Sequence, residues 1–163
     1  MNIVLARIDD RLIHGQVATV WSKATNCQRI IVCDDEVAND KIRATLLKQV
    51  APAVIKSHVV SLEKAVRVYN NPKYENDRCL LLFTKPASVL YLVEHGVDIK
   101  SVNIGGMSFH EGKKQVTSAV SVDDEDIDAF KKLNEKGIEL EIRKVDSDKK
   151  VMMMDVLHEK LGV

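Results

Sequence analysis

The sequence has little of what several protein classes require. Only three of its 163 residues are cysteines, at positions 27, 33 and 79, and an odd number does not make a disulfide framework. No run approaches the roughly 18 apolar residues of a membrane-spanning helix. The opening residues, MNIV, lead directly into a strand-like segment without signal-peptide features. Together these features predict a soluble, intracellular protein with reduced cysteines.

Net charge is absent as well. The chain has 24 lysines and arginines against 24 aspartates and glutamates, which gives a formal charge of zero. Proteins that bind nucleic acid usually carry a basic excess, because contacts with phosphates supply most of their affinity. Anchoring to a membrane by charge requires a dense cluster of lysines and arginines, which the sequence does not contain. We therefore expect neither nucleic acid nor a membrane surface as a binding partner.

Short apolar runs alternate with helix-like segments along the whole chain. Strands are expected at residues 2–8, 29–33, 54–60, 79–83, 99–104 and 139–145. Helices are expected at residues 14–24, 38–50, 61–69, 86–95 and 123–136. This alternation predicts βαβ units and one α/β domain over residues 1–163. The expected fold is an open, mostly parallel twisted sheet with helices on both faces and an added edge strand near the C-terminus, for which residues 115–122 are the candidate.

Polar residues gather where the predicted strands end. In open parallel sheets, ligands bind outside the carboxyl ends of the strands. Those ends carry the segments Asp9–His14, Asp34–Asp35, Thr84–Pro86 and Gly105–Met107. The first segment is the most suggestive, because together with Arg7 it places two arginines, two aspartates and a histidine within eight residues.

His14 lies at or just before the start of a predicted helix, and Gly15 leaves the backbone there open. Free N–H groups and the helix dipole favour an anion at this position, and the Arg11 guanidinium matches phosphate oxygens. A helix N-terminus also favours a neutral, nucleophilic imidazole, and a neighbouring carboxylate could fix which ring nitrogen attacks. A histidine in a loop is also commonly a surface residue or a capping partner, so residue spacing leaves both interpretations open.

The whole segment Val4–Val17, VLARIDDRLIHGQV, closely resembles a known active-site signature. It is the signature of the enzyme IIB component of bacterial phosphotransferase systems of the mannose/fructose/sorbose class. The segments IVCDDEVAND (31–40), LFTKP (82–86) and VNIGGMSF (102–109) fit the same family, so the resemblance covers essentially the whole chain. One departure is that Val145 is followed by Asp146, where family members often carry proline.

The resemblance implies a protein-Nπ-phosphohistidine–sugar phosphotransferase. Such proteins accept a phosphoryl group from the phosphorylated IIA protein and deliver it to a sugar carried through the membrane IIC and IID components. The implied location is cytoplasmic, on the inner face of the membrane through contact with the transporter. A homo-oligomer is compatible with the sequence, which does not reveal the sugar or the ring nitrogen that is phosphorylated.

The resemblance also implies roles for individual residues. His14 matches the phosphorylated histidine, Arg11 the arginine that pairs with the phosphoryl oxygens, and Asp10 a residue that organises the loop and Arg11. The residues implied to bind phosphate or substrate are Arg7, Gly15, Thr84, Gly105 and Gly106. Because the N–P bond of phosphohistidine is itself high in energy, no cofactor or metal is expected.

Two alternatives belong to other classes. One is Mg²⁺-dependent phosphoryl transfer to an aspartate, as in receiver domains, with Asp9–Asp10 and Asp34–Asp35 as ligands and Lys85 as a candidate partner. The simpler interpretation of Asp34–Asp35, which we favour, is that they end a strand and cap a helix. The other alternative is a non-catalytic module that binds a small molecule.

Overall fold

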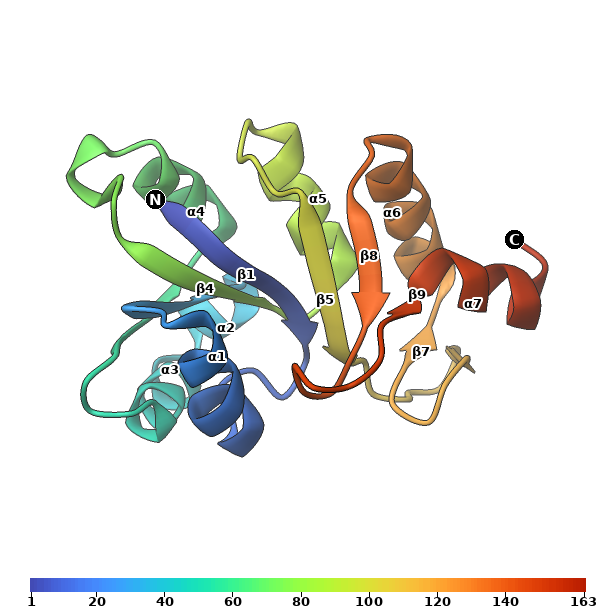
Figure 1. Ribbon diagram of the computed structural model, residues 1–163, viewed down its shortest axis with the longest axis horizontal. Helices are drawn as coiled ribbons and strands as arrows, with labels where there is room; N and C mark the ends of the chain where they lie inside the picture. The colour runs from blue at the N-terminus through green and yellow to red at the C-terminus, as the bar shows by residue number, and fades with distance from the viewer.

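A seven-stranded sheet organises the computed structural model, which describes residues 1–163 (Figure 1). Its strand order is β3-β2-β4-β1-β5-β8-β9. The strands are β1 (Asn2–Asp9), β2 (Arg29–Cys33), β3 (Lys56–Val60), β4 (Arg78–Phe83), β5 (Ser101–Gly106), β8 (Glu139–Ile142) and β9 (Val151–Met152). All neighbouring pairs are parallel except β8 and β9, which are antiparallel. The predicted open, mostly parallel sheet with an added edge strand is confirmed.

Helices cover both faces of the sheet. One face carries the π-helical turn η1 (Val17–Trp21), α1 (Ser22–Thr25), α2 (Asp35–Asn39) and α3 (Lys41–Val50), and α1 lies in front of the sheet in Figure 1. The other face is covered by α4 (Leu62–Tyr69), α5 (Pro86–Glu94) and α6 (Asp124–Glu135), and α7 (Met153–Leu161) packs beside α6. A 3-10 turn, η2 (Pro72–Tyr74), precedes β4. None of the helices has the length and apolar character that crossing a bilayer requires.

Several helix boundaries follow from capping side chains. Ser61 accepts a hydrogen bond from the N–H of Lys64 and begins α4 where the sequence predicts. The helix expected at 38–50 is instead two helices, because Asp40 has an extended backbone and its side chain accepts from the N–H of Arg43 to begin α3. The single-helix prediction was therefore wrong, and the missed signal is an N-cap aspartate inside an otherwise helical pattern.

The C-terminal part also differs from the expectation. Residues 115–122 do not lie at the edge of the main sheet; β6 (Lys114–Gln115) and β7 (Ser121–Val122) form a separate antiparallel pair. The edge strand is β9, which pairs with β8 and comes from the tail that looked amphipathic at best. The position of the edge strand was thus predicted wrongly, because a two-residue strand leaves no periodic pattern in the sequence.

Strand order decides where a ligand site can form. The chain leaves β1 across the near face toward β2 and leaves the neighbouring strand β5 across the far face toward β8 (Figure 1). Connections that diverge from adjacent strands open a crevice at the carboxyl ends of those strands. The loops that follow β1 and β5 therefore meet at the switch point of the sheet.

Candidate active site

The loop after β1 is a tight turn anchored by the buried side chain of Leu12. The backbone N–H of Leu12 donates to the carbonyl oxygen of Asp9 at 2.8 Å. Leu12 has a φ of 61°, a left-handed conformation that costs a residue with a side chain about 1–2 kcal/mol. Its side chain is fully buried in the same hydrophobic cluster as Ile13, Val17 and Val32, and this burial offsets the backbone strain. The turn directs both Arg11 and His14 back toward the end of β1.

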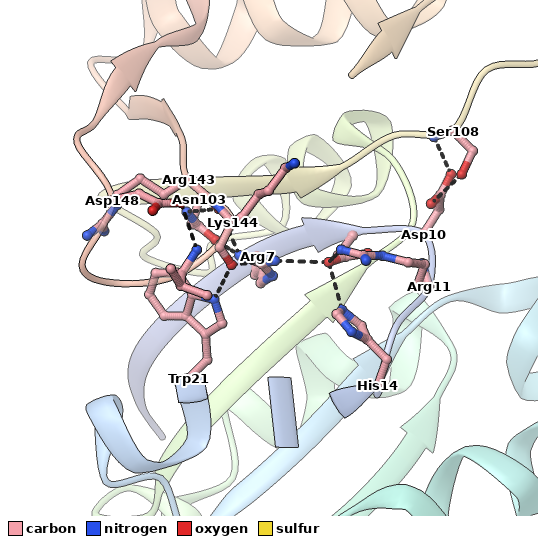
Figure 2. Close-up of polar contacts among 12 residues, drawn as sticks. Arg7, Asp10, Arg11, His14, Trp21, Asn103, Ser108, Arg143, Lys144 and Asp148 are labelled. Atoms are coloured by element: carbon pink, nitrogen blue, oxygen red, sulfur yellow. Dashed lines mark hydrogen bonds and ion pairs between the residues drawn. The ribbon is translucent and has the colours of Figure 1, made fainter. Parts of the chain in front are cut away.

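The carboxylate of Asp9 is the centre of the site, because Arg7, Arg11 and His14 all contact it. Figure 2 labels these three side chains. Oδ2 of Asp9 lies 3.0 Å from Nη2 of Arg7, 3.0 Å from Nη2 of Arg11 and 3.0 Å from Nε2 of His14. Its Oδ1 accepts from the backbone N–H and from Nε of Arg11 at 3.2 and 3.0 Å. Because Asp9 is fully buried, one carboxylate positions both exposed side chains of the loop.

Neighbouring donors keep Asp9 ionised. Burial by itself would raise the pKa of the Asp9 carboxyl, but hydrogen bonds from His14 and Arg11 and the charge of Arg7 outweigh it and hold this pKa well below its ordinary value. The same contact raises the pKa of the Arg11 guanidinium. Burial lowers the pKa of Arg7 from its ordinary value. The site is thus a buried carboxylate surrounded by cationic donors.

The contact with Asp9 determines which nitrogen of His14 is free. An ionised carboxylate can only accept a hydrogen bond, so Nε2 of His14 must carry the proton in this contact. In the neutral ring the lone pair then lies on Nδ1. The His14 side chain is 19% exposed, which leaves it within reach of a second molecule.

Groups that can hold an anion surround His14. The residues that follow it are helical, and no hydrogen bond in the structure uses the backbone N–H of Gly15 or Gln16. A Cβ placed on Gly15 would have no atom within 4 Å, so this side of the loop is open. Arg11 is half-exposed, and its Nη1 makes no hydrogen bond within the protein. These donors can neutralise a phosphoryl group on His14.

The Arg7 guanidinium is buried beneath the loop. Its Nη1 donates to Oδ1 of Asn103 and to the carbonyl oxygen of Arg143, and its Nη2 donates to the carbonyl oxygen of Lys144 as well as to Asp9. The ring of Trp21 lies 5.2 Å from the Arg7 guanidinium, measured to the ring centroid. Arg7 therefore links the ends of β1, β5 and β8 (Figure 2).

A cavity of about 440 Å³ opens beside the loop at the switch point. Asp10 and Arg11 line it on the β1 side, and Gly106 and Ser108 line it on the β5 side. Asp10 accepts hydrogen bonds from the backbone N–H and from Oγ of Ser108 at 2.7 and 2.9 Å. This pair joins the two loops and fixes one wall of the cavity (Figure 2).

Comparison with known proteins identifies the family. Residues 3–162 match the family described as "PTS system sorbose subfamily IIB component". The chain belongs to this family. The sorbose-specific EIIB component of Klebsiella pneumoniae is 56% identical over 159 residues, which cover 98% of this chain and 97% of that protein. The crystal structure of the IIBSor domain of the sorbose permease from the same organism superposes with a TM-score of 0.97 at 55% identity and covers 100% of both chains.

A longer relative resembles the chain in part of its length. The mannose-specific EIIAB component of Escherichia coli strain K12 is 64% identical over 157 residues, which cover 96% of this chain but 49% of that protein. The chain therefore spans about half the length of such EIIAB relatives. The resemblance to a mannose/fructose/sorbose-class IIB component, stated from the sequence, is confirmed.

The IIB fold brings together some of the residues selected from the sequence. Arg11, His14 and Gly15 lie on one loop, and a Cβ on Gly106 would lie 3.4 Å from Oδ1 of Asp9 and 3.6 Å from Nη2 of Arg11. Asp10 lies next to them, but its carboxylate binds Ser108 rather than Arg11. The expectation that Asp10 organises Arg11 is corrected by the structure, because Asp9 does so.

The expectation that Arg7 binds phosphate also needs correction. Arg7 is fully buried, with both terminal nitrogens on protein acceptors, so it does not face the space where a phosphoryl group would bind. Gly105 lies against Arg7: a Cβ at this position would overlap the guanidinium. Its lack of a side chain makes room for Arg7, and Gly105 also lines the cavity at the switch point together with Gly106.

Thr84 is directed away from the IIB loop. Its Oγ1 donates to Oδ2 of Asp34 at 2.6 Å, and Oδ1 of Asp34 accepts from the N–H of Val37 as the N-cap of α2. Thr84 therefore does not line the cavity at the switch point, contrary to the expectation. The interpretation of Asp34–Asp35 as strand-ending and capping residues is confirmed. Both carboxylates are engaged by protein donors, since Asp35 accepts from the N–H of Leu62.

The sequence pattern did not single out Asp9 as the residue that positions Arg11 and His14. Asp9 is one of two adjacent aspartates, and nothing local distinguishes it from Asp10. The signal available was strand alternation: Ala6 and Ile8 face the core between the sheet and α5, so Arg7 and Asp9 share the opposite face. A buried arginine on that face requires a buried counter-charge, and Asp9 is two residues away on the same side.

Proposed function

We propose that this IIB chain carries a phosphoryl group on Nδ1 of His14, between a phosphorylated IIA protein and a sugar that passes through membrane IIC and IID components. The observation that carries the proposal is the contact between Nε2 of His14 and the buried Asp9 carboxylate at 3.0 Å. It fixes the ring orientation, keeps the proton on Nε2 and leaves the lone pair on Nδ1. A phosphoryl acceptor needs such a positioned lone pair.

The first transfer requires no acid or base from this chain. The Nδ1 lone pair attacks the phosphorus of the phosphohistidine on IIA, the N–P bond of the donor breaks, and its electron pair returns to the donor ring. The Nε2 proton remains between His14 and Asp9, whose negative charge stabilises the positive charge that develops on the ring. Charge on the transferring oxygens is neutralised by Arg11 and the free N–H groups of Gly15 and Gln16.

In the second transfer His14 is the phosphoryl donor and the sugar is the acceptor. A hydroxyl oxygen of the sugar attacks the phosphorus, the bond to Nδ1 breaks with its electron pair returning to the His14 ring, and the hydroxyl proton passes to water or to a base of the membrane components. Both transfers need His14 at an accessible rim of the site. The IIA histidine and then the sugar hydroxyl must each approach the phosphorus in line with the bond that forms or breaks. The partial exposure of His14 beside the cavity supports this arrangement. We place the protein in the cytoplasm, at the inner face of the membrane through contact with the transporter.

Labelling from phosphoenolpyruvate through enzyme I, HPr and a mannose-class IIA protein tests the proposal. We expect wild type to take up an acid-labile label and His14→Gln to take up none. His110→Gln, in the exposed loop after β5, is the matched control and should label as wild type does. A label that resists acid but is lost in base would instead indicate an acyl phosphate and the Mg²⁺-dependent alternative. Nitrogen-15 NMR of the labelled protein should find phosphorus on Nδ1; finding it on Nε2 would contradict the assignment from Asp9.

A further inference from the structure

An exposed surface of α3 and the loop after it combines an apolar row with unpaired cations. We define it as the α3 face. Its apolar members are Ile42, Leu46, Val50 and Val54, and its cations are Lys41, Arg43, Lys48 and Lys56. We propose that the α3 face binds the surface of an anionic lipid bilayer. This binding goes beyond the proposed function, since neither the His14 site nor a phosphoryl group takes part in it.

The apolar members form a continuous row. Ile42, Leu46 and Val50 follow one another at intervals of four residues, which places them along one side of the helix. Their exposed fractions are 77%, 57% and 47%, and Val54 beyond the helix end is 91% exposed. Single exposed apolar residues are ordinary in soluble proteins, but three in a row on one helix, with a fourth just beyond its end, mark a contact surface.

The cations of the α3 face have no ionic partners. Residues 41–62 contain two exposed lysines on α3, one arginine, and Lys56 at the start of β3, and no aspartate or glutamate. None of these four takes part in a salt bridge, whereas Arg29, Lys100, Lys113, Lys132, Arg143 and Lys150 elsewhere in the chain do. Asp40, the exposed N-cap residue of α3, adds one negative charge at the start of the helix, so on this face four cations outnumber one acid although the whole chain has zero net charge. The sequence did not indicate this local excess, because the cations are spaced apart rather than clustered.

The cations flank the apolar row on both sides. At about 100° per residue, Arg43 lies on one side of the row, and Lys41 and Lys48 lie on the other beyond Thr45 and Gln49. Val54 lines one cavity together with Lys23 and Lys56, and the acid in that lining, Asp77, is paired with Arg29, so cations without an ionic partner continue past the helix end. An apolar row bordered by lysine and arginine is the pattern of a helix that lies in the plane of a bilayer surface.

Charge complementarity selects lipid over a second copy of this chain. In a twofold contact the row would meet itself and bring the unpaired cations of both copies together, which is repulsive. An anionic surface attracts the cations while the acyl region receives the apolar side chains, with each cation strengthening binding about fivefold. The contact is therefore expected to be weak, reversible and sensitive to salt.

The position of α3 fits such a contact, an argument that rests on the proposed function. Asp40 begins α3 shortly after the carboxyl end of β2, so the start of α3 lies at the same edge of the sheet as the loop after β1 (Figure 1). A bilayer against the first turns of α3 would bring that edge near a membrane-embedded acceptor.

Sedimentation with sucrose-loaded vesicles tests the proposal on the full chain. One set contains equal parts of phosphatidylglycerol and phosphatidylcholine, and the other contains phosphatidylcholine alone. We expect wild type to bind the first set at low salt, not the second, and to dissociate at about 1 M salt, where the Debye length falls to about 3 Å. The double variant Ile42→Ser with Leu46→Ser should bind at least about tenfold more weakly. Lys131→Gln with Lys136→Gln, which removes two exposed, unpaired cations at the α6 end of the molecule, should change nothing.

Three outcomes would overturn the proposal. They are no binding to phosphatidylglycerol vesicles at low salt, equal loss of binding in both double variants, and a wild-type dimer in sedimentation velocity that the Ile42 and Leu46 variant makes monomeric. Labelling of His14 in the apolar variant should equal that of wild type. A failure of vesicle binding with normal labelling therefore refutes the lipid contact alone, and vesicle binding without labelling refutes only the phosphoryl carrier.

Discussion

Replacement of Asp9 by asparagine is the most informative perturbation of the site. Asparagine keeps the shape of the side chain but removes the charge that Arg7, Arg11 and His14 share. It also presents an NH₂ group where the carboxylate accepted hydrogen bonds only. Stability and phosphoryl transfer should both suffer, for separable reasons.

The loss of stability can be worked from the contacts of Arg7. Removing one partner of a buried ion pair costs about 3–5 kcal/mol. Arg7 keeps its hydrogen bonds to Asn103 and to the carbonyl oxygens of Arg143 and Lys144, so we expect the lower end, about 3 kcal/mol. For a domain of this size that corresponds to a fall in Tm of about 6–12 °C.

The loss of activity follows from His14. With asparagine at position 9, Nε2 can either donate to the amide oxygen or accept from the amide nitrogen, so the proton is no longer confined to Nε2. The ring then loses both its fixed tautomer and the negative charge that stabilises it in the transition state. We expect phosphoryl transfer from IIA to slow between about 10²- and 10⁴-fold, the range found when a charge-stabilising group or a tautomer-fixing aspartate is removed.

Trp21, the single tryptophan, reports unfolding directly. Its ring lies 5.2 Å from the Arg7 guanidinium and 5.3 Å from that of Arg143, so its fluorescence should change as this cluster separates in urea. Asp10→Asn is the matched control: its carboxylate binds only Ser108, so stability should fall by about 1 kcal/mol or less. Equal stability and equal transfer rates in the two variants would refute the central role of Asp9.

Three further predictions follow from the same contacts. Gly105→Ala should lower stability by about 2 kcal/mol in urea unfolding, because the added methyl overlaps the Arg7 guanidinium; an unchanged midpoint would contradict the burial of Arg7. Thr84→Val should lower stability by about 1–2 kcal/mol, because Asp34 loses the hydrogen bond from Thr84, yet it should label at the wild-type rate. A large loss of labelling would show that Thr84 takes part in phosphoryl binding after all. The pKa of Asp9 in the folded state lies below its unfolded value of about 3.9. The stability that the ionised Asp9 contributes is therefore present above about pH 4 and is lost as the pH falls further. On acidification, the urea midpoint should drop less in Asp9→Asn than in wild type.

Local pattern was sufficient for much of the site. His14, Arg11 and Gly15 were found because they follow a strand and precede a helix within a few residues, and the structure keeps them on one loop. Asp34 was also placed correctly as a cap, since capping depends on the next three residues only. Interactions that span a few residues can be predicted from spacing.

Partners from distant segments could not be predicted in this way. Arg7 looked like a phosphate ligand because it is cationic and near His14 in the sequence, yet residues about 100 and 136 positions away bury it. Thr84 looked like a neighbour of the site because its strand ends at the right edge, but β4 lies between β2 and β1, and the Thr84 hydroxyl donates to Asp34 after β2 rather than to the loop after β1. The composition of a strand end does not reveal which other strand ends adjoin it.

The sequence by itself determined the class of fold and the reacting loop. Alternation of apolar strands and helices requires a parallel sheet with covered faces, and the Asp9–His14 segment carries its own turn, acid and nucleophile. Tertiary structure alone decided that Asp9 rather than Asp10 orients His14, that Arg7 is structural, and that the spaced cations of α3 share one face. The physical reason is that burial and pairing of charge depend on which elements lie side by side, and strand order and helix packing set that only once the chain has folded.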